Sequence, residues 1–531
     1  MKLTRISHLT THSVRVCLLA SVSFAQVKFE NLVHASQQPQ NWVMYSGDYA
    51  GRHYAGVDQI NTKNVVHLVP KWVYQTMAEG KFETTPLVVD GVLYGTAPDD
   101  RAFALDARSG RPIWQYQREL PADLRVCCGR VNRGVAILGD KLFMGTLDSH
   151  VIALDARKGT VIWDAKAADY SKGYSFTLAP LVIKKMVLVG ISGGEYGIRG
   201  FIDAYDADTG ERRWRFYTVP GPGEPGHDTW EGESWKTGGS PAWITGTYDP
   251  DTNTTFWTTG NPSPSNQGIG RAGDNLYSDS LLALDADTGT LKWHFQFTPH
   301  DEHDYDATQV PVVVDDGDRR RIVQANRNGF LYVIDRTNGR LVSATAYARQ
   351  TWSQSRDATG RPIPQKGSSP TLEGNPGCPG AAGATNWMSP SYDPQTKLFY
   401  VTAREQCDIF SAAAQPYDAG HAYYGSAYFP NEDAAPFWGA VRALDPSTGQ
   451  MKWEWKHTSP SWSGILSTAG GLLFTGDAEG NFIALDAATG QALWHFQCGA
   501  SVFAAPVSFV IDGQQYVAIA AGSALFAFGL P

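Results

Sequence analysis

Short apolar stretches separated by Gly, Asp, Asn and Pro dominate the pattern of hydrophobic and polar positions along the chain. Residues 86–94 have apolar side chains on both sides of the pair Asp90-Gly91, and residues 139–144 show a similar arrangement. Asp-Gly pairs favour tight turns between antiparallel strands. The pattern therefore predicts short β-strands joined in hairpins, and an all-β fold.

One phrase recurs along the chain: an apolar residue, Asp, three residues, Gly, three residues and Trp. Each copy predicts a strand, a turn in which Asp caps the backbone and Gly supplies a positive φ, and a second strand that carries the Trp. The complete copies are Asp106/Gly110/Trp114, Asp155/Gly159/Trp163, Asp206/Gly210/Trp214, Asp285/Gly289/Trp293, Asp445/Gly449/Trp453 and Asp486/Gly490/Trp494.

Two weaker copies complete the set. Asp335/Gly339 has Ser343 where Trp is expected, and Trp72 follows a related lead-in. Four short strands in about 40–50 residues is the period of a propeller blade. We therefore predict one eight-bladed β-propeller over residues 26–531, with Trp residues packed between blades.

The two ends of this propeller are expected to meet. Residues 502–531 predict inner strands without a following Asp-Gly-Trp phrase, and the region from Trp42 to Trp72 would supply the missing outer strand. Pairing of N- and C-terminal strands would then close the ring and hide its edges. Longer spacings place insertions around residues 230–235 and 370–383 in two of the blades.

Composition and charge narrow the classes of partner. Only 18% of the 531 residues are charged, and the net charge is −9. Lys and Arg are scattered along the sequence rather than clustered. This excludes the basic footprint of a nucleic-acid-binding protein. Residues 1–25 resemble a signal peptide, and no later apolar run approaches the roughly 18–20 residues of a membrane span. The sequence thus predicts a periplasmic protein.

The cysteines leave two questions open. Cys378 and Cys407 could form a disulfide that staples a long insertion in an oxidising compartment. The adjacent Cys127 and Cys128 could be free thiols or could close a strained eight-membered ring. No Cys-x-x-Cys-His motif occurs, so this sequence offers no attachment site for a c-type haem.

The repeat resembles the tryptophan-docking motif of quinoprotein dehydrogenases, which carry pyrroloquinoline quinone (PQQ), although non-catalytic assembly scaffolds share it. The string from Cys127 to Gly134 is more specific, because it looks like the vicinal disulfide of PQQ-dependent methanol and ethanol dehydrogenases. In that family the disulfide lies against one face of the quinone. Trp243, in Gly-Ser-Pro-Ala-Trp, matches the aromatic residue that stacks on the other face.

The resemblance also implies a metal site. Glu195 and Asn261 match the family's metal ligands, and Asp304 matches its catalytic aspartate, which also contacts the metal. Oxygen ligands of this kind suit a hard cation. Asp306 lies two positions further on, and in a strand-like stretch both carboxylates would share a face. This Asp-Tyr-Asp pattern resembles lanthanide-dependent enzymes, so we expect a lanthanide(III), with Ca²⁺ as the alternative.

Further cofactor contacts follow from the same residue-by-residue comparison. Arg327 matches the basic residue that faces the quinone oxygens, and Pro241 departs from the family, where Thr makes a hydrogen bond. The remaining positions expected to hold PQQ are Glu83, Cys127, Cys128, Arg133, Thr177, Ser192, Gly193, Gly194, Asn386 and Trp462.

The resemblance implies oxidation of a primary alcohol to an aldehyde by hydride transfer to PQQ, with Asp304 as general base and Arg327 stabilising the reduced quinone. Electrons would leave for a separate, soluble cytochrome c. Two alternatives stay open: a calcium-dependent quinoprotein for larger polyols, and a non-catalytic scaffold propeller. Neither the particular alcohol nor the oligomeric state, for which a homodimer is one option, follows from the sequence.

Overall fold

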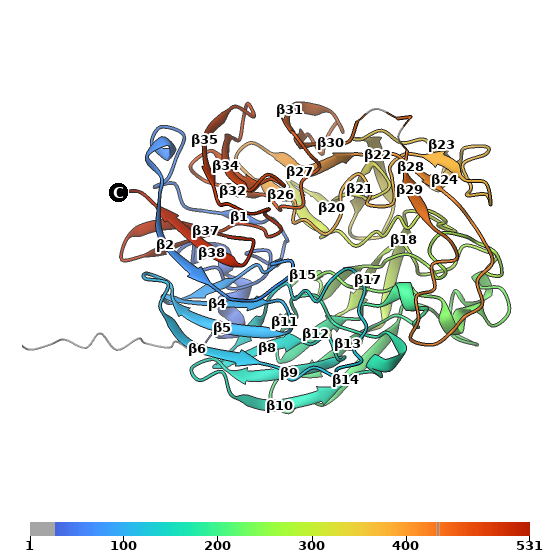
Figure 1. Cartoon of the computed structure of the whole chain (residues 1–531), viewed down its shortest axis with the longest axis horizontal. Helices are drawn as coiled ribbons and strands as arrows, with labels where there is room; N and C mark the ends of the chain where they lie inside the picture. The colour runs from blue at the N-terminus through green and yellow to red at the C-terminus, as the bar shows by residue number, and fades with distance from the viewer. Residues whose placement is uncertain (1–26, 432, 435) are drawn as a thin grey trace, which may run out of the picture.

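The structure, a computed structural model, describes residues 27–431, 433–434 and 436–531, and shows an all-β molecule. Eight sheets follow one another around a common centre (Figure 1). Within the described residues α1 (Phe29–Val33) is the single α-helix. The predicted leader, residues 1–25, lies outside the described residues. The prediction of an eight-bladed propeller is confirmed.

The first four blades are antiparallel sheets of four consecutive strands. Their strands are β3 (Leu87–Val89), β4 (Val92–Ala97), β5 (Arg101–Asp106) and β6 (Pro112–Gln117); β7 (Ala136–Leu138), β8 (Lys141–Gly145), β9 (His150–Asp155) and β10 (Val161–Lys166); β11 (Leu181–Ile183), β12 (Met186–Gly190), β13 (Phe201–Asp206) and β14 (Arg212–Tyr217); β15 (Thr247–Asp249), β16 (Thr254–Thr258), β17 (Ser280–Asp285) and β18 (Leu291–Gln296).

Three more blades follow, the third of which contains β1 (Tyr54–Ala55) paired in parallel with β32. Their strands are β19 (Val312–Asp316), β20 (Arg319–Ala325), β21 (Phe330–Asp335) and β22 (Leu341–Ala346); β26 (Ser391–Asp393), β27 (Leu398–Glu405), β30 (Trp438–Leu444) and β31 (Met451–His457); β32 (Leu466–Thr468), β33 (Leu472–Gly476), β34 (Asn481–Asp486) and β35 (Ala492–Gln497). The parallel pair lies in the blade that begins with β32.

The eighth blade closes the ring as predicted. Its inner strands β36 (Val507–Ile511), β37 (Gln514–Ala521) and β38 (Ala524–Gly529) come from the C-terminus, and its outer strand β2 (Val69–Gln75) comes from the N-terminal region. Figure 1 shows blue β2 beside red β38, and the two pair antiparallel with Tyr74 opposite Leu525. The N-terminal and C-terminal strands are thereby joined in one sheet, which conceals the edge of β38.

The repeated phrase docks each blade onto the next. The Trp114 indole donates from Nε1 to the Ala156 carbonyl of the following blade at 2.9 Å, and Trp72 donates to Ala107 at 3.0 Å. The Gly of the next copy leaves room for the ring, because a Cβ on Gly110 would lie 2.6 Å from the Trp72 ring. Where Ser343 replaces Trp, the corresponding Gly449 meets the smaller Thr345 side chain instead.

The insertions form small additional elements at the periphery. The 3-10 turns η1 (Ala35–Gln37) and η2 (Val65–His67) lie in the N-terminal region, and η3 (Tyr170–Lys172) and η4 (Gly194–Tyr196) lie in connections between blade strands. The insertions contain the 3-10 turns η5 (His227–Thr229) and η6 (Ser234–Thr237), the hairpin β23 (Ser353–Arg356) and β24 (Pro362–Pro364), and the three-stranded sheet of β25 (Asn375–Gly377), β28 (Asp408–Phe410) and β29 (Tyr428–Pro430). Cys378 and Cys407 form a disulfide in this region, which confirms that pairing.

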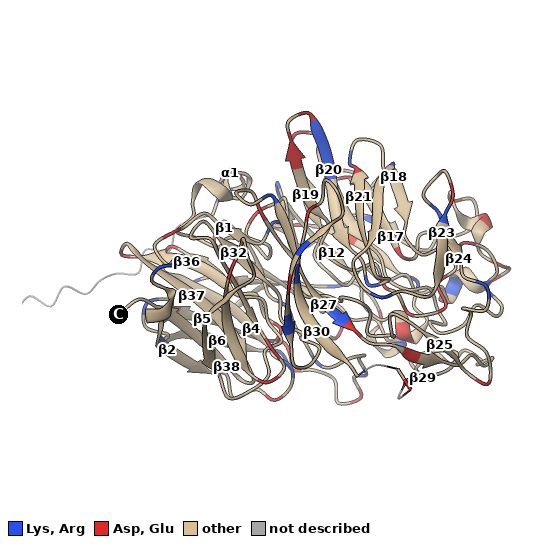
Figure 2. Ribbon diagram, turned by 90° about the horizontal axis from the view of Figure 1, so that it is seen from above, with Lys and Arg blue, Asp and Glu red and all other residues tan. Residues whose placement is uncertain are grey.

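Charged residues of both signs are dispersed over the molecule (Figure 2). They form ion pairs on several outer turns, such as Lys184 with Asp287 at 2.7 Å. No helix in the described part of the chain is long and apolar enough to cross a membrane.

Candidate functional site

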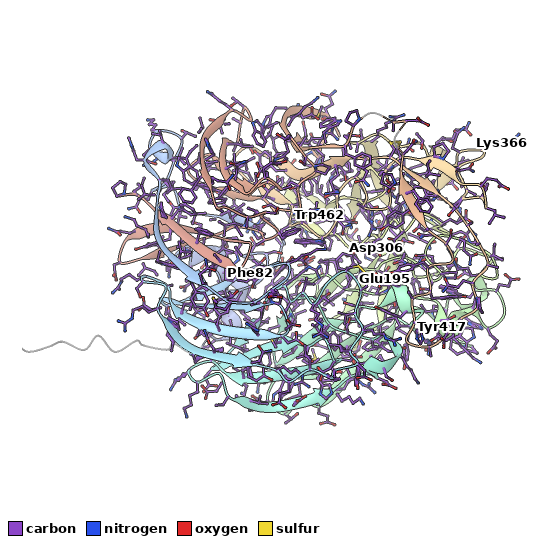
Figure 3. All side chains as sticks on the ribbon, viewed as in Figure 1. Phe82, Glu195, Asp306, Lys366, Tyr417 and Trp462 are labelled. Carbon is purple, nitrogen blue, oxygen red and sulfur yellow. A yellow bond between two sulfur atoms is a disulfide. The ribbon has the colours of Figure 1, made fainter. Side chains whose placement is uncertain are left out.

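A cavity of about 320 Å³ lies near the centre of the ring and is lined by loops from successive blades. In an up-and-down sheet, the loop after the second strand and the crossover to the next blade emerge at the same end. Figure 3 places Glu195, Asp306 and Trp462 around this centre. Fourteen of the predicted site residues line the cavity: Glu83, Cys127, Cys128, Arg133, Thr177, Ser192, Gly193, Glu195, Trp243, Asp304, Asp306, Arg327, Asn386 and Trp462.

A buried guanidinium binds two of the predicted carboxylates. Arg327, in the loop between β20 and β21, donates from Nη2 to Asp304 at 2.8 Å and from Nη1 to Asp306 at 2.6 Å. Its Nε donates to the Ala381 carbonyl at 3.0 Å. The head group of Arg327 is therefore held by three partners while it lines the cavity.

The backbone around Asp304 differs from the extended geometry expected for an Asp-x-Asp pair. Residues 301–306 form a loop, and Asp304 has a φ of 61°. The cause is Asp301, whose buried carboxylate accepts from the backbone N–H of His303 at 3.0 Å and of Tyr305 at 2.7 Å. The strand-like prediction is wrong, yet both Asp304 and Asp306 reach the cavity.

Two predicted residues, Gly194 and Asn261, lie behind the lining. Gly194 directly precedes Glu195, and a Cβ at Gly194 would lie 3.3 Å from the Asn261 Oδ1 atom. The Asn261 amide donates from Nδ2 to Pro262, while its Oδ1 is buried and has no hydrogen-bond partner among the described residues. An unpaired buried amide oxygen beside carboxylates fits a place in the coordination shell of a hard cation.

The carboxylates are electrostatically costly without a cation. Burial raises the pKa of Glu195 to about 7, and repulsion by Asp306 adds to this effect. Burial also raises the pKa of Asp304 and of Asp306, although the charge of Arg327 opposes the increase in both. Arg327 pairs with only two of the three carboxylates, Asp304 and Asp306, and a multivalent cation would relieve the repulsion among all three.

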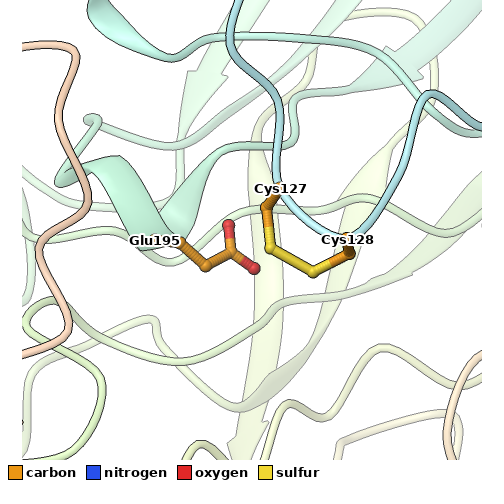
Figure 4. Close-up of side chains that lie close together, drawn as sticks. All are labelled: Cys127, Cys128 and Glu195. Atoms are coloured by element: carbon orange, nitrogen blue, oxygen red, sulfur yellow. A yellow bond between two sulfur atoms is a disulfide. The ribbon is translucent and has the colours of Figure 1, made fainter. Parts of the chain in front are cut away.

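The adjacent cysteines form a disulfide at the cavity wall. Figure 4 shows the bonded sulfur atoms facing the Glu195 carboxylate, and a carboxylate oxygen and both Sγ atoms lie within 4.8 Å of one another. Cys127 is partly buried, whereas Cys128 is exposed. Of the two alternatives left open by the sequence, the structure has the vicinal disulfide.

A polar cluster occupies another wall of the cavity. Arg133 forms a buried ion pair with Glu83 at 2.7 Å and donates to the Thr177 hydroxyl at 3.0 Å, which in turn lies 2.9 Å from the Ser192 hydroxyl. The Arg133 guanidinium also lies 5.1 Å from the ring centre of Trp243. Together these groups offer hydrogen bonds and positive charge to the rim of a flat, carboxylated molecule.

Aromatic rings complete the wall. The indoles of Trp387 and Trp462 are nearly parallel, with an interplanar angle of 14° and ring centres 6.5 Å apart. Planar rings, a disulfide and a guanidinium around one cavity form a surface suited to a planar aromatic ligand. On this basis the residues present fit PQQ.

The structure adds lining residues that the sequence reasoning missed: Lys81, Val131, Ser175, Ala381, Ala382, Trp387 and Tyr428. Trp387 directly follows the predicted Asn386, so its place in the sequence could have indicated that it also faces the cavity. Tyr428 belongs to an insertion without a repeat, and nothing in the local sequence indicates that it faces the site.

Family models match two parts of the chain. Residues 42–347 match the model described as glucose/ethanol/alcohol dehydrogenase, beta-propeller domain. Residues 438–529 match the model of outer membrane protein assembly factor BamB. The first match spans most of the loops that build the cavity.

Similarity to curated proteins extends over nearly the whole chain. The quinoprotein alcohol dehydrogenase PedH of Pseudomonas putida is 39% identical over 537 residues, covering 95% of this chain and 90% of PedH. A lanthanide-dependent methanol dehydrogenase of Methylacidiphilum fumariolicum is 36% identical over 541 residues, covering 95% of this chain and 88% of that enzyme. A solved europium-containing methanol dehydrogenase superposes with a TM-score of 0.90 at 32% identity and covers 94% of this chain and 100% of its own.

Proposed function

Because the chain belongs to the PQQ-dependent alcohol dehydrogenase family and is an oxidoreductase of that family, we propose that it oxidises small primary alcohols to aldehydes. It would do so in the periplasm with PQQ and a lanthanide ion, and it would pass the electrons to a separate cytochrome c. One observation carries the proposal: Asp306 lines the same cavity as Glu195 and Asp304, and it accepts from the N–H of Asn261, whose Oδ1 is unpaired. Such a donor set attracts a trivalent ion more strongly than a divalent one.

The metal would be held by Glu195, Asn261, Asp304 and Asp306. Arg133, Glu83, Thr177 and Ser192 would bind the polar rim of PQQ, and Trp243 and the disulfide would enclose its ring, with Gly193, Gly194, Asn386 and Trp462 at its edges. Bound PQQ supplies the hydride acceptor, and the metal polarises it as a Lewis acid.

The protein's own groups would manage the proton and the orientation of the alcohol. Asp304 lies at the cavity with one carboxylate oxygen 2.8 Å from Arg327 Nη2, and its other oxygen is available to accept the proton of an alcohol hydroxyl. Arg327 holds this carboxylate in place and would stabilise negative charge that develops beside it. Burial raises the pKa of Asp304 in the absence of a cation, and a bound cation would oppose this increase.

A calcium-dependent quinoprotein acting on larger polyols is the second candidate, and one observation favours its metal. Both Asp306 oxygens already have protein partners, since Oδ1 accepts from the Asn261 N–H at 2.8 Å and Oδ2 accepts from Arg327. If Asp306 serves only these partners, the remaining ligands would suit Ca²⁺.

The test uses the mature protein freed of metal and loaded with PQQ and either La³⁺ or Ca²⁺. Metal content and dye reduction are measured with methanol, ethanol, butanol and glycerol. Turnover with La³⁺ is expected, and Asp306→Asn should lower La³⁺ affinity by about tenfold or more relative to Ca²⁺, a difference of about 1.4 kcal/mol. Asp304→Ala should bind PQQ but lose turnover. Failure to bind PQQ with either metal would overturn the proposal.

A further inference from the structure

Arg404, on β27, lies behind the wall of the cavity formed by Trp462. Its side chain is 5% exposed, and its guanidinium lies 4.0 Å from the centre of the Trp462 ring. Nη1 donates to the Ser461 carbonyl at 3.1 Å, and Nη2 donates weakly to Gln406 at 3.4 Å. The Nε atom is buried and has no hydrogen-bond partner in the described part of the chain.

The charge of Arg404 is uncompensated. Several other buried arginines have carboxylate partners, such as Arg442, which contacts Glu405 at 2.7 Å, whereas Arg271 binds only carbonyl and amide oxygens. Among residues 27–431, 433–434 and 436–531, no carboxylate lies within ion-pair distance of Arg404. Asp408 is the acid whose charge favours the protonated form of Arg404. Its carboxylate oxygens have other partners, because they accept from the Ala381 N–H at 2.8 Å and from Gln406 at 3.1 Å.

An unpaired buried cation is costly, and a side chain with a purely packing role need not be charged. Burial lowers the pKa of Arg404 to about 10, and the nearby charge of Arg327 acts in the same direction. The group therefore stays protonated at neutral pH. Arg404 and Arg327 together place two positive charges beside one cavity, one of them behind an aromatic wall.

We propose that Arg404 is a positioning residue that acts through Trp462: it holds the indole against the cavity and raises the reduction potential of bound PQQ. This inference rests on the proposed use of PQQ. Reduction makes the cofactor more negative, and a fixed positive charge in a medium of low dielectric constant favours the more negative state. The planar guanidinium stacks on the indole, which a compact ammonium group does less well.

The experiment compares Arg404→Gln with Arg404→Lys in the metal-loaded holoenzyme by spectroelectrochemical titration of PQQ. At a fixed electrode potential, the Gln variant should hold about tenfold more oxidised over reduced PQQ than the wild type, equivalent to a midpoint about 30 mV lower for a two-electron couple. The Lys variant should recover most of this shift. Trp462 fluorescence should change in both variants, because each loses the stacked guanidinium.

Arg215→Gln is the matched control for the cost of removing a partly buried arginine. Arg215 lies 3.5 Å from the Phe201 ring centre and pairs with Asp203, outside the cavity lining. Arg215→Gln should lower the free energy of unfolding without changing the reduction potential of PQQ. If Arg404→Gln does not take up PQQ, Gln406→Glu neutralises Arg404 in place and should lower the potential in the same direction.

Two outcomes would overturn the inference: a wild-type potential in a PQQ-loaded Arg404→Gln or Gln406→Glu protein, or equal potentials in the Gln and Lys variants. Failure of the wild-type protein itself to bind PQQ would instead overturn the proposed function. The two failures are therefore distinguishable.

Discussion

Asp301 shows how a residue outside the cavity can determine the position of those inside it. Its carboxylate accepts two backbone N–H groups of the loop that carries Asp304 and Asp306, and it is 1% exposed. Two charge-assisted hydrogen bonds stabilise this loop and offset the cost of the positive φ of Asp304. The orientation of the predicted base therefore depends on a residue that touches neither alcohol nor cofactor.

Asp301→Asn is expected to lower kcat by about tenfold to a hundredfold, because a small displacement of a reacting group is enough for such a loss. The free energy of unfolding should fall by about 1–3 kcal/mol, since the amide presents N–H groups to a backbone donor. Steady-state kinetics and denaturant unfolding measure the two effects. PQQ content should be unchanged.

Asp169→Asn provides the control for this substitution. Asp169 accepts from the Ser171 N–H at 3.1 Å in an exposed turn, so it makes the same kind of backbone contact outside the cavity lining. Its replacement should leave kcat unaltered. A wild-type kcat in Asp301→Asn would show that the loop keeps its shape without the carboxylate.

At the scale of elements, strand β31 contains a histidine that the fold keeps neutral. His457 is 5% exposed, neither ring nitrogen has a partner in the described residues, and the ring packs edge-on against Trp455 at 4.8 Å. Burial lowers the pKa of His457 from 6.5 to about 4, although Glu479 opposes the shift. The unfolded chain therefore binds a proton at a pH where the native strand does not.

This difference makes stability depend on pH in a defined direction. The contribution of His457 is complete above pH 6.5 and is lost as the pH falls toward the native pKa of about 4. Between pH 7 and pH 5 the loss should amount to about 2 kcal/mol. His457→Phe keeps an aromatic ring and should remove this part of the slope, as measured by urea unfolding at both pH values. Parallel slopes for the two proteins would contradict the assignment.

The strands also show how far the sequence could predict the fold and the site. The Asp-Gly-Trp phrase encodes its structure locally, through Asp caps such as that of Asp106 on the N–H of Ser109 at 2.9 Å, so blades and docking were predictable. The wall contributed by Ala381 and Tyr428 was not, because non-local pairings place it: β25 with β28, and β28 with β29. Its geometry depends on tertiary contacts and the Cys378–Cys407 disulfide.

At the scale of the whole molecule, the eighth blade is special because its outer strand, β2, comes from the other end of the chain than its inner strands. In the first blade β6 follows β5 through a short turn, whereas β2 is far in sequence from its partner β38. Detachment of β2 is therefore limited by hydrogen bonds and side-chain packing rather than by a covalent turn. The ring should open first at this seam.

Trp72 and Trp114 allow this idea to be tested with matched substitutions. Both indoles are 8% exposed and donate to the following blade, at 3.0 Å and 2.9 Å, but only Trp72 lies on the closing strand. Each change to Ala should lower the free energy of unfolding by about 3–5 kcal/mol through lost packing. Their local effects should differ, because β2 has no turn to keep it beside its neighbour.

Hydrogen exchange followed by mass spectrometry distinguishes the two variants. Trp72→Ala should increase exchange in β2 and β38 well before global unfolding, while Trp114→Ala should increase exchange near β6 without exposing β5 to the same extent. Opening at the seam would also release the strand edge that closure conceals, so the Trp72 variant should aggregate at lower temperature. Equal protection of β38 in both variants would show that packing within the eighth blade, and not the docking of β2, holds the ring closed.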